Sequence, residues 1–201
     1  MASPSFHRIG LTGGIGSGKT TLGRMLVARG IPLVDADAIS HQVTAPQGAG
    51  IEPIRQQFGD AFINAQGALD RDRMRQHVFT NPEAKLALQS LLHPLIQQSI
   101  NQAMDTAAQQ GHAMVLLDIP LLVESLRWRG LLDKVIVVDC SEQTQVRRVM
   151  ARNHMSEADV RQIMANQAKR SERLAAADVV VFNDEDDLAH LQAQALGIML
   201  A

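Results

Sequence analysis

The sequence predicts an α/β protein built on a wound parallel sheet of five strands, with a helical insertion. Three observations predict this class. A glycine-rich segment lies between a short apolar strand and a helix, several continuous apolar runs end in an acid, and one long stretch shows helical periodicity alone. Continuous apolar runs are typical of strands buried on both faces of a parallel sheet. The strand-free stretch therefore reads as an insertion between two strands of the core.

The first strand and helix enclose a phosphate-binding pattern. Residues 9–21 read Ile-Gly-Leu-Thr-Gly-Gly-Ile-Gly-Ser-Gly-Lys-Thr-Thr, with a glycine, four free positions, Gly-Lys and Thr in register. Glycines let the backbone turn its amides toward an anion, and the helix adds the positive end of its dipole. Lys19 is expected to reach the outer phosphates and Thr20 to bind Mg²⁺. The residues expected to bind the nucleotide are Gly13, Gly14, Ile15, Gly16, Ser17, Gly18, Lys19, Thr20 and Thr21. The alternative is a glycine-rich turn that binds nothing.

The second strand is expected at 31–34 and is followed by two acids, Asp35 and Asp37. Ligands of open α/β sheets lie beyond the carboxyl ends of the strands, so both acids should face the same crevice as the phosphate loop. Asp37 is the candidate base for an acceptor hydroxyl. The alternative is that Asp37 caps the following helix.

Residues 38–110 are expected to be helical. A short helix from Pro53 should stop at Gly59, Asp70 should cap a second, and Asn81 should start a long third helix. Pro94 falls inside this third helix and should break or kink it. This insertion is the best candidate for a subdomain that holds a substrate.

The remaining strands are expected at 113–118, 134–139 and 178–182, and the helix after 134–139 carries Arg147, Arg148 and Arg152. Arg148 and Arg152 are four residues apart and share a face, which suits a lid that neutralises the phosphates of ATP. A solvated basic surface is the alternative. The last helix should start at Asn183 or Asp184, and its acidic run at 185–187 is interpreted as a helix start rather than a binding site.

Three further residues have two interpretations each. Asp118 ends an apolar strand, where an acid can complete a Mg²⁺ shell or be oriented by the backbone. His93 could contact a substrate or be structural. Cys140 is interpreted as core packing.

Composition excludes several classes of protein. The net charge is −2, so the basic excess of a nucleic-acid binder is missing. A single cysteine predicts a reducing compartment, no apolar run is long enough for a membrane span, and residues 1–8 do not resemble a secretory signal. We expect a cytoplasmic protein with a small-molecule substrate, no nucleic-acid or membrane partner, and a monomer as the favoured oligomeric state.

Several segments together resemble the dephospho-coenzyme A kinase family: the phosphate loop at 11–20, Val-Asp-Ala-Asp at 34–37, His-Pro-Leu-Ile at 93–96, Pro-Leu-Leu-Val-Glu at 120–124 and Gln-x-x-Arg-x-x-x-Arg at 145–152. The resemblance implies a three-layer P-loop NTPase-type core (1–37, 111–140 and 166–201), a helical CoA-substrate domain (38–110) and a lid (141–165). It implies that ATP, with Mg²⁺, phosphorylates the ribose 3′-hydroxyl of dephospho-CoA.

The same resemblance implies the roles of the site residues. Asp37, Lys19 and Arg148 would be catalytic, and Arg148 and Arg152 would bind ATP beside the loop. The metal ligands come from the residues themselves and not from the resemblance: Thr20 follows from the phosphate-loop pattern, and Asp118 is a second candidate at the end of its strand. The implied substrate-binding residues are Asp37, His93, Pro94, Leu121, Leu122 and Glu124.

Two other functions stay open on the residues alone. One is a kinase for another small hydroxylated metabolite, although the insertion is large for a small acceptor. The other is a nucleotide-gated binding protein. The sequence does not favour it, because the Asp-x-x-Gly and Asn-Lys-x-Asp segments of GTPases are missing.

Overall fold

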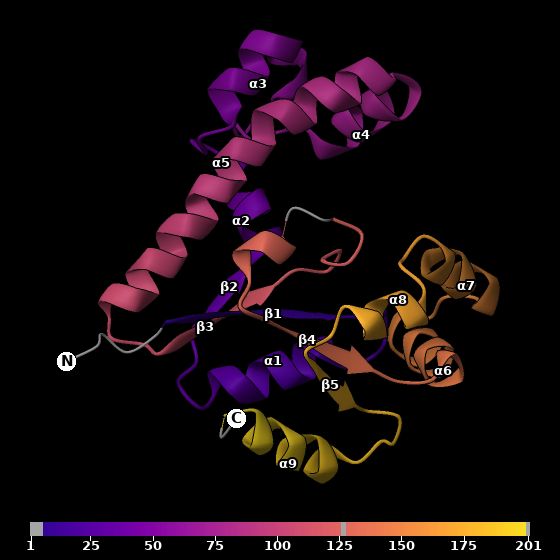
Figure 1. The fold of residues 1–201 in the computed structure, drawn as a ribbon. Coiled ribbons are helices and arrows are strands. Elements are labelled where there is room, and N and C mark those ends of the chain that lie inside the picture. Colours follow the sequence, from indigo (N-terminus) through magenta and orange to yellow (C-terminus); the bar gives the residue numbers. More distant parts are fainter. Residues whose placement is uncertain (1–5, 126–127, 200–201) are drawn as a thin grey trace. The chain divides into compact units, whose positions relative to one another are not determined.

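The computed structural model describes residues 6–125 and 128–199. This part of the chain forms a five-stranded sheet in the order β2-β3-β1-β4-β5 (Figure 1). The strands are β1 (His7–Gly13), β2 (Leu33–Asp35), β3 (Met114–Asp118), β4 (Lys134–Asp139) and β5 (Val179–Phe182). The pairs β1–β3, β1–β4 and β4–β5 are parallel. The predicted α/β class and its five core strands are therefore confirmed.

The strand order fixes where a ligand can bind. β1 lies between β3 and β4. The connection after β1 runs to β2 on one side of β1, whereas the connection after β3 crosses to β4 on the other side. Such a switch point opens a crevice at the carboxyl end of the central strand. The glycine-rich loop follows β1 directly and therefore lies at this crevice.

The helices connect these strands within the described ranges. They are α1 (Lys19–Val27), α2 (Ala36–Val43), α3 (Ile51–Phe58), α4 (Arg71–Thr80), α5 (Pro82–Gln109), α6 (Glu142–Asn153), α7 (Glu157–Ala165), α8 (Arg170–Ala175) and α9 (Leu188–Met199), with short 3₁₀ turns η1 (Asp60–Phe62) and η2 (Arg129–Leu131). None of the helices described is long and apolar enough to cross a membrane.

The chain divides into two compact units, 1–34 with 107–201, and 35–106. In the first unit α1 and α9 pack together, and their apolar faces cover the sheet (Figure 1). Leu11, Leu22, Ile136 and Leu191 are among the buried residues of this core. Cys140 is also buried in this unit, and burial raises the pKa of its thiol to about 11, so its expected packing role is confirmed.

The second unit is helical and has its own small core, formed by Ile51, Ile54, Leu69 and Met74. Its helix starts follow the predicted caps. The Asp70 carboxylate accepts a hydrogen bond from the Arg73 amide at 3.0 Å, and the Asn81 side chain accepts one from the Ala84 amide at 3.0 Å. These caps satisfy amides that the first helical turn leaves without a partner.

Pro94 does not break α5, which contradicts one of the two outcomes expected for it. The helix runs without interruption from Pro82 to Gln109. A proline inside a helix costs about 3 kcal/mol, because it removes one backbone hydrogen bond. Leu91 and Leu92 pack against the core of this unit just before Pro94, and Ile100 is fully buried after it. Packing on both sides of the proline offsets this cost.

The last helix starts later than predicted. α9 begins at Leu188, so residues 183–187 form a connection between β5 and α9 and not a helical turn. The Asp187 carboxylate accepts a hydrogen bond from the Ala189 amide at 2.8 Å and so caps α9. Asn183 and Asp184 bond to other segments, which keeps them out of the helix.

Candidate phosphate-binding site

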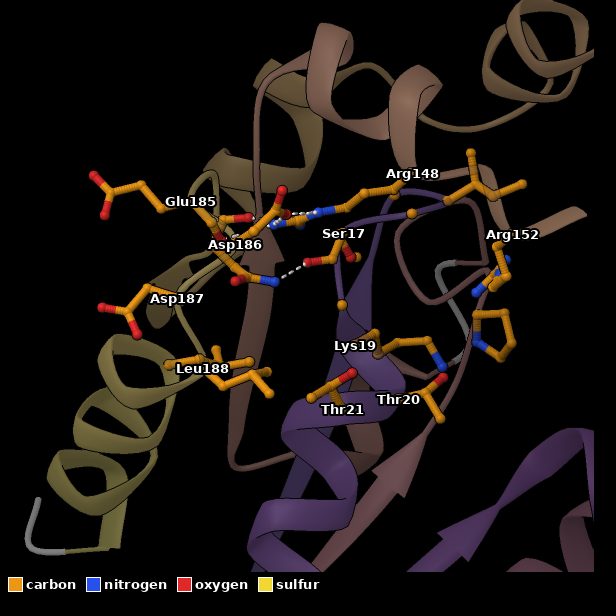
Figure 2. A pocket seen from close by; sticks show the side chains of 18 of the residues that line it. Ser17, Lys19, Thr20, Thr21, Arg148, Arg152, Glu185, Asp186, Asp187 and Leu188 are labelled. Carbon is orange, nitrogen blue, oxygen red and sulfur yellow. Dashed lines mark hydrogen bonds and ion pairs between the residues drawn. The ribbon is translucent and has the colours of Figure 1, made fainter. Parts of the chain in front are cut away.

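A cavity of about 560 Å³ opens at the glycine-rich loop, within the size range of small-molecule sites. All the residues that the sequence assigned to nucleotide binding lie on its wall: residues 13–21 from the loop and α1, with Arg148 and Arg152 from α6. Figure 2 shows Lys19, Thr20 and Thr21 at the start of α1, with Arg152 on the same side. The cavity wall also includes Pro120, Gln167, Asn183, Glu185, Asp186, Asp187, Leu188 and Leu191.

The loop needs glycine where it turns into α1. Gly18 has φ +95°, and a Cβ there would lie 2.2 Å from Nδ2 of Asn183. This buried asparagine donates a hydrogen bond to the Ser17 carbonyl at 2.7 Å. The segment after β5 therefore holds the loop in place. Sequence reasoning missed Asn183, although its position directly after a core strand is a signal for a residue at the crevice.

Lys19 is paired with an acid at the end of a neighbouring strand. Its ammonium contacts a carboxylate oxygen of Asp118, and both side chains are largely buried, at 17% and 14% exposed. The pair holds the lysine ammonium at the carboxyl edge of the sheet, where a phosphate would lie. Asp118 does not itself line the cavity.

The oxygen groups near the loop suit Mg²⁺. The Thr20 hydroxyl lies on the cavity wall, and the Asp118 carboxylate is held beside Lys19. Among the described residues, no group of three or more His, Cys, Asp or Glu could hold a metal. Magnesium at nucleotide sites takes only one or two protein ligands and completes its shell with phosphates and water, so the Thr20 hydroxyl on the cavity wall fits it, whereas the Asp118 carboxylate is engaged by Lys19.

The two cavity arginines of α6 have different surroundings. The Arg148 guanidinium donates to the Asn183 carbonyl at 2.8 Å, to the Glu185 carbonyl at 2.8 Å and to the Asp186 carboxylate at 3.0 Å. Figure 2 shows Arg148 extended toward this segment. The Arg152 Nε donates to the neutral Asn153 side chain at 2.7 Å. Arg148 thus orders residues 183–186, and Arg152 places its charge one turn further along the cavity.

The acidic segment 185–187 lies directly before α9, which Asp187 caps, and it also forms part of the cavity wall. Hydrogen bonds from Arg147 and Arg148 lower the pKa of Asp186 to about 2. Asp184 is held by the Ser141 amide at 2.8 Å and the Ser141 hydroxyl at 2.7 Å, and these bonds lower its pKa. Both acids are therefore ionised near neutral pH and fix the segment to α6 and its first turn.

Asp35 and Asp37 do not share one strand face. Asp35 ends β2 and its carboxylate accepts a hydrogen bond from the Ala38 amide at 2.9 Å, so Asp35 is the residue that caps α2. Asp37 lies in the first turn of that helix. Asp37, His93 and Pro94 all belong to the unit 35–106. Their contact with a substrate remains a prediction.

The substrate residues expected after β3 differ in exposure. Leu121 is 51% exposed, whereas Leu122 is 2% exposed and packs beside Gly10. Leu122 therefore contributes to the core, and a substrate-binding role does not fit its position. The Glu124 carboxylate accepts a hydrogen bond from the Ala168 amide at 2.7 Å, which ties the segment after β3 to the segment before α8.

A parallel sheet with β1 at its centre, a glycine-rich loop and a cavity holding one lysine and two arginines defines a phosphate-loop nucleotide-binding protein. Residues 7–188 match the family model described as Dephospho-CoA kinase. The chain belongs to the dephospho-CoA kinase family.

Relatives that align along nearly their whole length agree with this assignment. The dephospho-CoA kinase of Albidiferax ferrireducens is 48% identical over 92% of this chain and 87% of its own length. The solved dephospho-CoA kinase of Campylobacter jejuni is 25% identical and superposes with a TM-score of 0.73, covering 97% of this chain and 96% of its own. A solved Thermus thermophilus protein is 30% identical with a TM-score of 0.81, covering 98% and 97%. The similarity therefore extends over nearly the whole chain.

Proposed function

We propose that this chain transfers the γ-phosphoryl group of ATP to the ribose 3′-hydroxyl of dephospho-CoA, giving CoA and ADP in the last step of coenzyme A biosynthesis. The observation that carries the proposal is the family match over residues 7–188, joined to one cavity that contains the complete phosphate loop, Lys19 and two arginines. Because ATP is available in the cytoplasm, we place the enzyme there.

The loop and Lys19 are proposed to bind the triphosphate. Residues 14–19 line the cavity, and α1 adds the positive end of its dipole. Asp118 holds the Lys19 ammonium at this position. A phosphate that enters can take over the lysine from Asp118, so the positive charge lies beside the phosphates before the reaction.

Thr20 and Asp118 are the residues that would hold Mg²⁺. When bound, the metal would neutralise charge on the phosphates.

Asp37 is the proposed base or orienting acid for the 3′-hydroxyl. Asp35 makes the capping hydrogen bond of α2, so the helix does not require the Asp37 carboxylate for that purpose. The capping role of Asp35 supports the proposed role of Asp37. We propose that the unit 35–106, with His93 and Pro94, binds the CoA portion of the acceptor.

Arg148 and Arg152 are proposed to have different roles in the lid formed by residues 141–165. Arg148 is bonded to two backbone carbonyls and to Asp186, so it organises the segment that lines the cavity. Arg152 is bonded to a neutral side chain and is the better candidate to neutralise the transferring phosphoryl group.

A comparison of acceptors tests the substrate class. The purified protein is incubated with ATP and Mg²⁺ and with dephospho-CoA, adenosine, gluconate or no acceptor, and ADP release is measured. The proposal predicts ADP release that depends on dephospho-CoA. Equal rates without acceptor would support a nucleotide-gated binding protein, and faster release with adenosine or gluconate would support a different small-molecule kinase.

A further inference from the structure

One amide of the phosphate loop already has a hydrogen-bond partner inside the protein. The backbone amide of Ile15 donates to Oε1 of Gln167 at 3.0 Å, across 152 positions of sequence. Both residues line the cavity. A neutral side-chain oxygen therefore satisfies one amide of the phosphate loop, on the wall of the cavity that we propose holds ATP.

The backbone beside Gln167 is fixed from both sides. The Ala168 amide donates to the Glu124 carboxylate at 2.7 Å, and the Ala168 carbonyl accepts from the Arg173 guanidinium. The Lys169 amide donates to the Glu172 carboxylate at 2.8 Å and starts α8. These contacts hold residues 168 and 169, directly after Gln167, so the Gln167 side chain reaches the loop from a defined position.

Ile15 is also held on the other side of the contact. Its side chain packs against the small core of α6 and α7 formed by Val146, Val149 and Val160. The direction of the Ile15 amide is therefore set by packing in the lid, while Gln167 satisfies the amide itself. Without this oxygen, the amide would have to be satisfied by water or remain unpaired.

We propose that Gln167 is a positioning residue whose amide oxygen stands in for a nucleotide phosphate and is displaced when ATP binds. The inference rests on the proposed binding of ATP at this loop. A phosphate oxygen is charged and accepts a stronger hydrogen bond from an amide than a neutral carboxamide oxygen does. ATP therefore displaces the Gln167 oxygen from the Ile15 amide. This displacement lowers the net affinity for ATP, because the hydrogen bond between Ile15 and Gln167 must break before the Ile15 amide can bond to a phosphate oxygen.

The test compares three variants in their affinity for ATP by titration calorimetry at pH 7.5. Gln167→Ala removes the competing oxygen and should tighten ATP binding by about threefold to tenfold, the effect of one net hydrogen bond. Gln167→Glu keeps the shape but adds a charged acceptor that also repels phosphate, and should weaken binding by about tenfold or more. Asn166→Ala is the matched control, because the Asn166 side chain donates to the Gln162 carbonyl of α7 and should leave the affinity unchanged.

A second measurement follows the Ile15 amide itself, first without nucleotide and then with ATP. Hydrogen exchange of the Ile15 amide should be faster in Gln167→Ala than in the parent, equal to the parent in Asn166→Ala, and slow again in Gln167→Ala once ATP is bound. Melting temperatures of the nucleotide-free variants show whether each one is folded.

The outcomes separate the inference from the proposed function. If the parent binds ATP but Gln167→Ala binds it equally or more weakly, or if the Ile15 amide exchanges at the parent rate in that variant, the stand-in role is wrong. If the parent itself does not bind ATP, the proposed function fails, and the inference fails with it.

Discussion

Gly18→Ala perturbs the contact between the phosphate loop and the segment after β5. Gly18 has φ +95°, and the added Cβ would meet Nδ2 of Asn183 at 2.2 Å. No contact at this distance is tolerated, so the Asn183 side chain must move. It then loses its hydrogen bond to the Ser17 carbonyl, which is 2.7 Å long and buried.

The cost has two parts. A residue with a Cβ in left-handed backbone costs about 1–2 kcal/mol. Loss of a buried hydrogen bond that leaves its partner unsatisfied costs about 1–3 kcal/mol. We therefore expect the free energy of unfolding to fall by about 2–5 kcal/mol, a large share of the roughly 5–15 kcal/mol of an ordinary domain.

The assay is urea unfolding followed by far-ultraviolet circular dichroism, with Gly30→Ala as the matched control. Gly30 has φ +87° in the same unit, and a Cβ added there would have no neighbouring atom within 4 Å. Gly30→Ala should show only the backbone cost of about 1–2 kcal/mol. In an Asn183→Ala background the clash and the hydrogen bond are both absent, so Gly18→Ala should then cost no more than Gly30→Ala.

Two results would refute this reasoning. Gly18→Ala could prove no more destabilising than Gly30→Ala, which would mean that Asn183 moves without loss. Alternatively, the excess cost could persist in the Asn183→Ala background, which would place its origin elsewhere in the loop.

Three further predictions concern the acid and the lid. Asp37→Asn should lower turnover by about 10²–10⁴-fold while the Kd for ATP changes by less than about threefold, since a base acts on the acceptor. Steady-state rates measure turnover, and calorimetry measures the Kd. Full activity of the variant would show that Asp37 has no catalytic role. Arg152→Gln should mainly lower kcat, whereas Arg148→Gln should mainly raise the KM for ATP, each by about tenfold or more. Steady-state kinetics at varied ATP concentration measure both constants. The reverse pattern would mean that the two arginines have each other's proposed role. Asp186→Asn should be less stable than the parent at pH 7, because the pKa of Asp186 is lowered from 3.8 to about 2 on folding. This stabilisation is complete above pH 3.8 and is lost as the pH falls through about 2, so the difference between the two proteins in urea unfolding should shrink as the pH is lowered across this window, and a constant difference would contradict it.

Local patterns in the sequence predicted local structure well. Asp70, Asn81 and Ser141 cap the helices expected of them, since a cap depends on residues three positions apart. The phosphate loop was readable for the same reason, because its glycines, Lys19 and Thr20 lie within one short stretch.

The errors arise where distant segments decide the outcome. Asn183 and Glu185 were assigned to a helix start, but bonds to Ser17 and Arg148 hold them as a loop. Leu122 belongs to a motif, yet its packing beside Gly10 buries it. The contact between Gln167 and Ile15 leaves no local pattern at all.

The central claim is tested most directly by identifying the product. Dephospho-CoA, ATP and Mg²⁺ are incubated with the purified chain, and mass spectrometry with fragmentation locates any added phosphoryl group. We expect dephospho-CoA to gain one phosphoryl group at the ribose 3′-hydroxyl, which gives CoA and an equal amount of ADP. Unchanged dephospho-CoA, or a phosphoryl group on another hydroxyl, would contradict it.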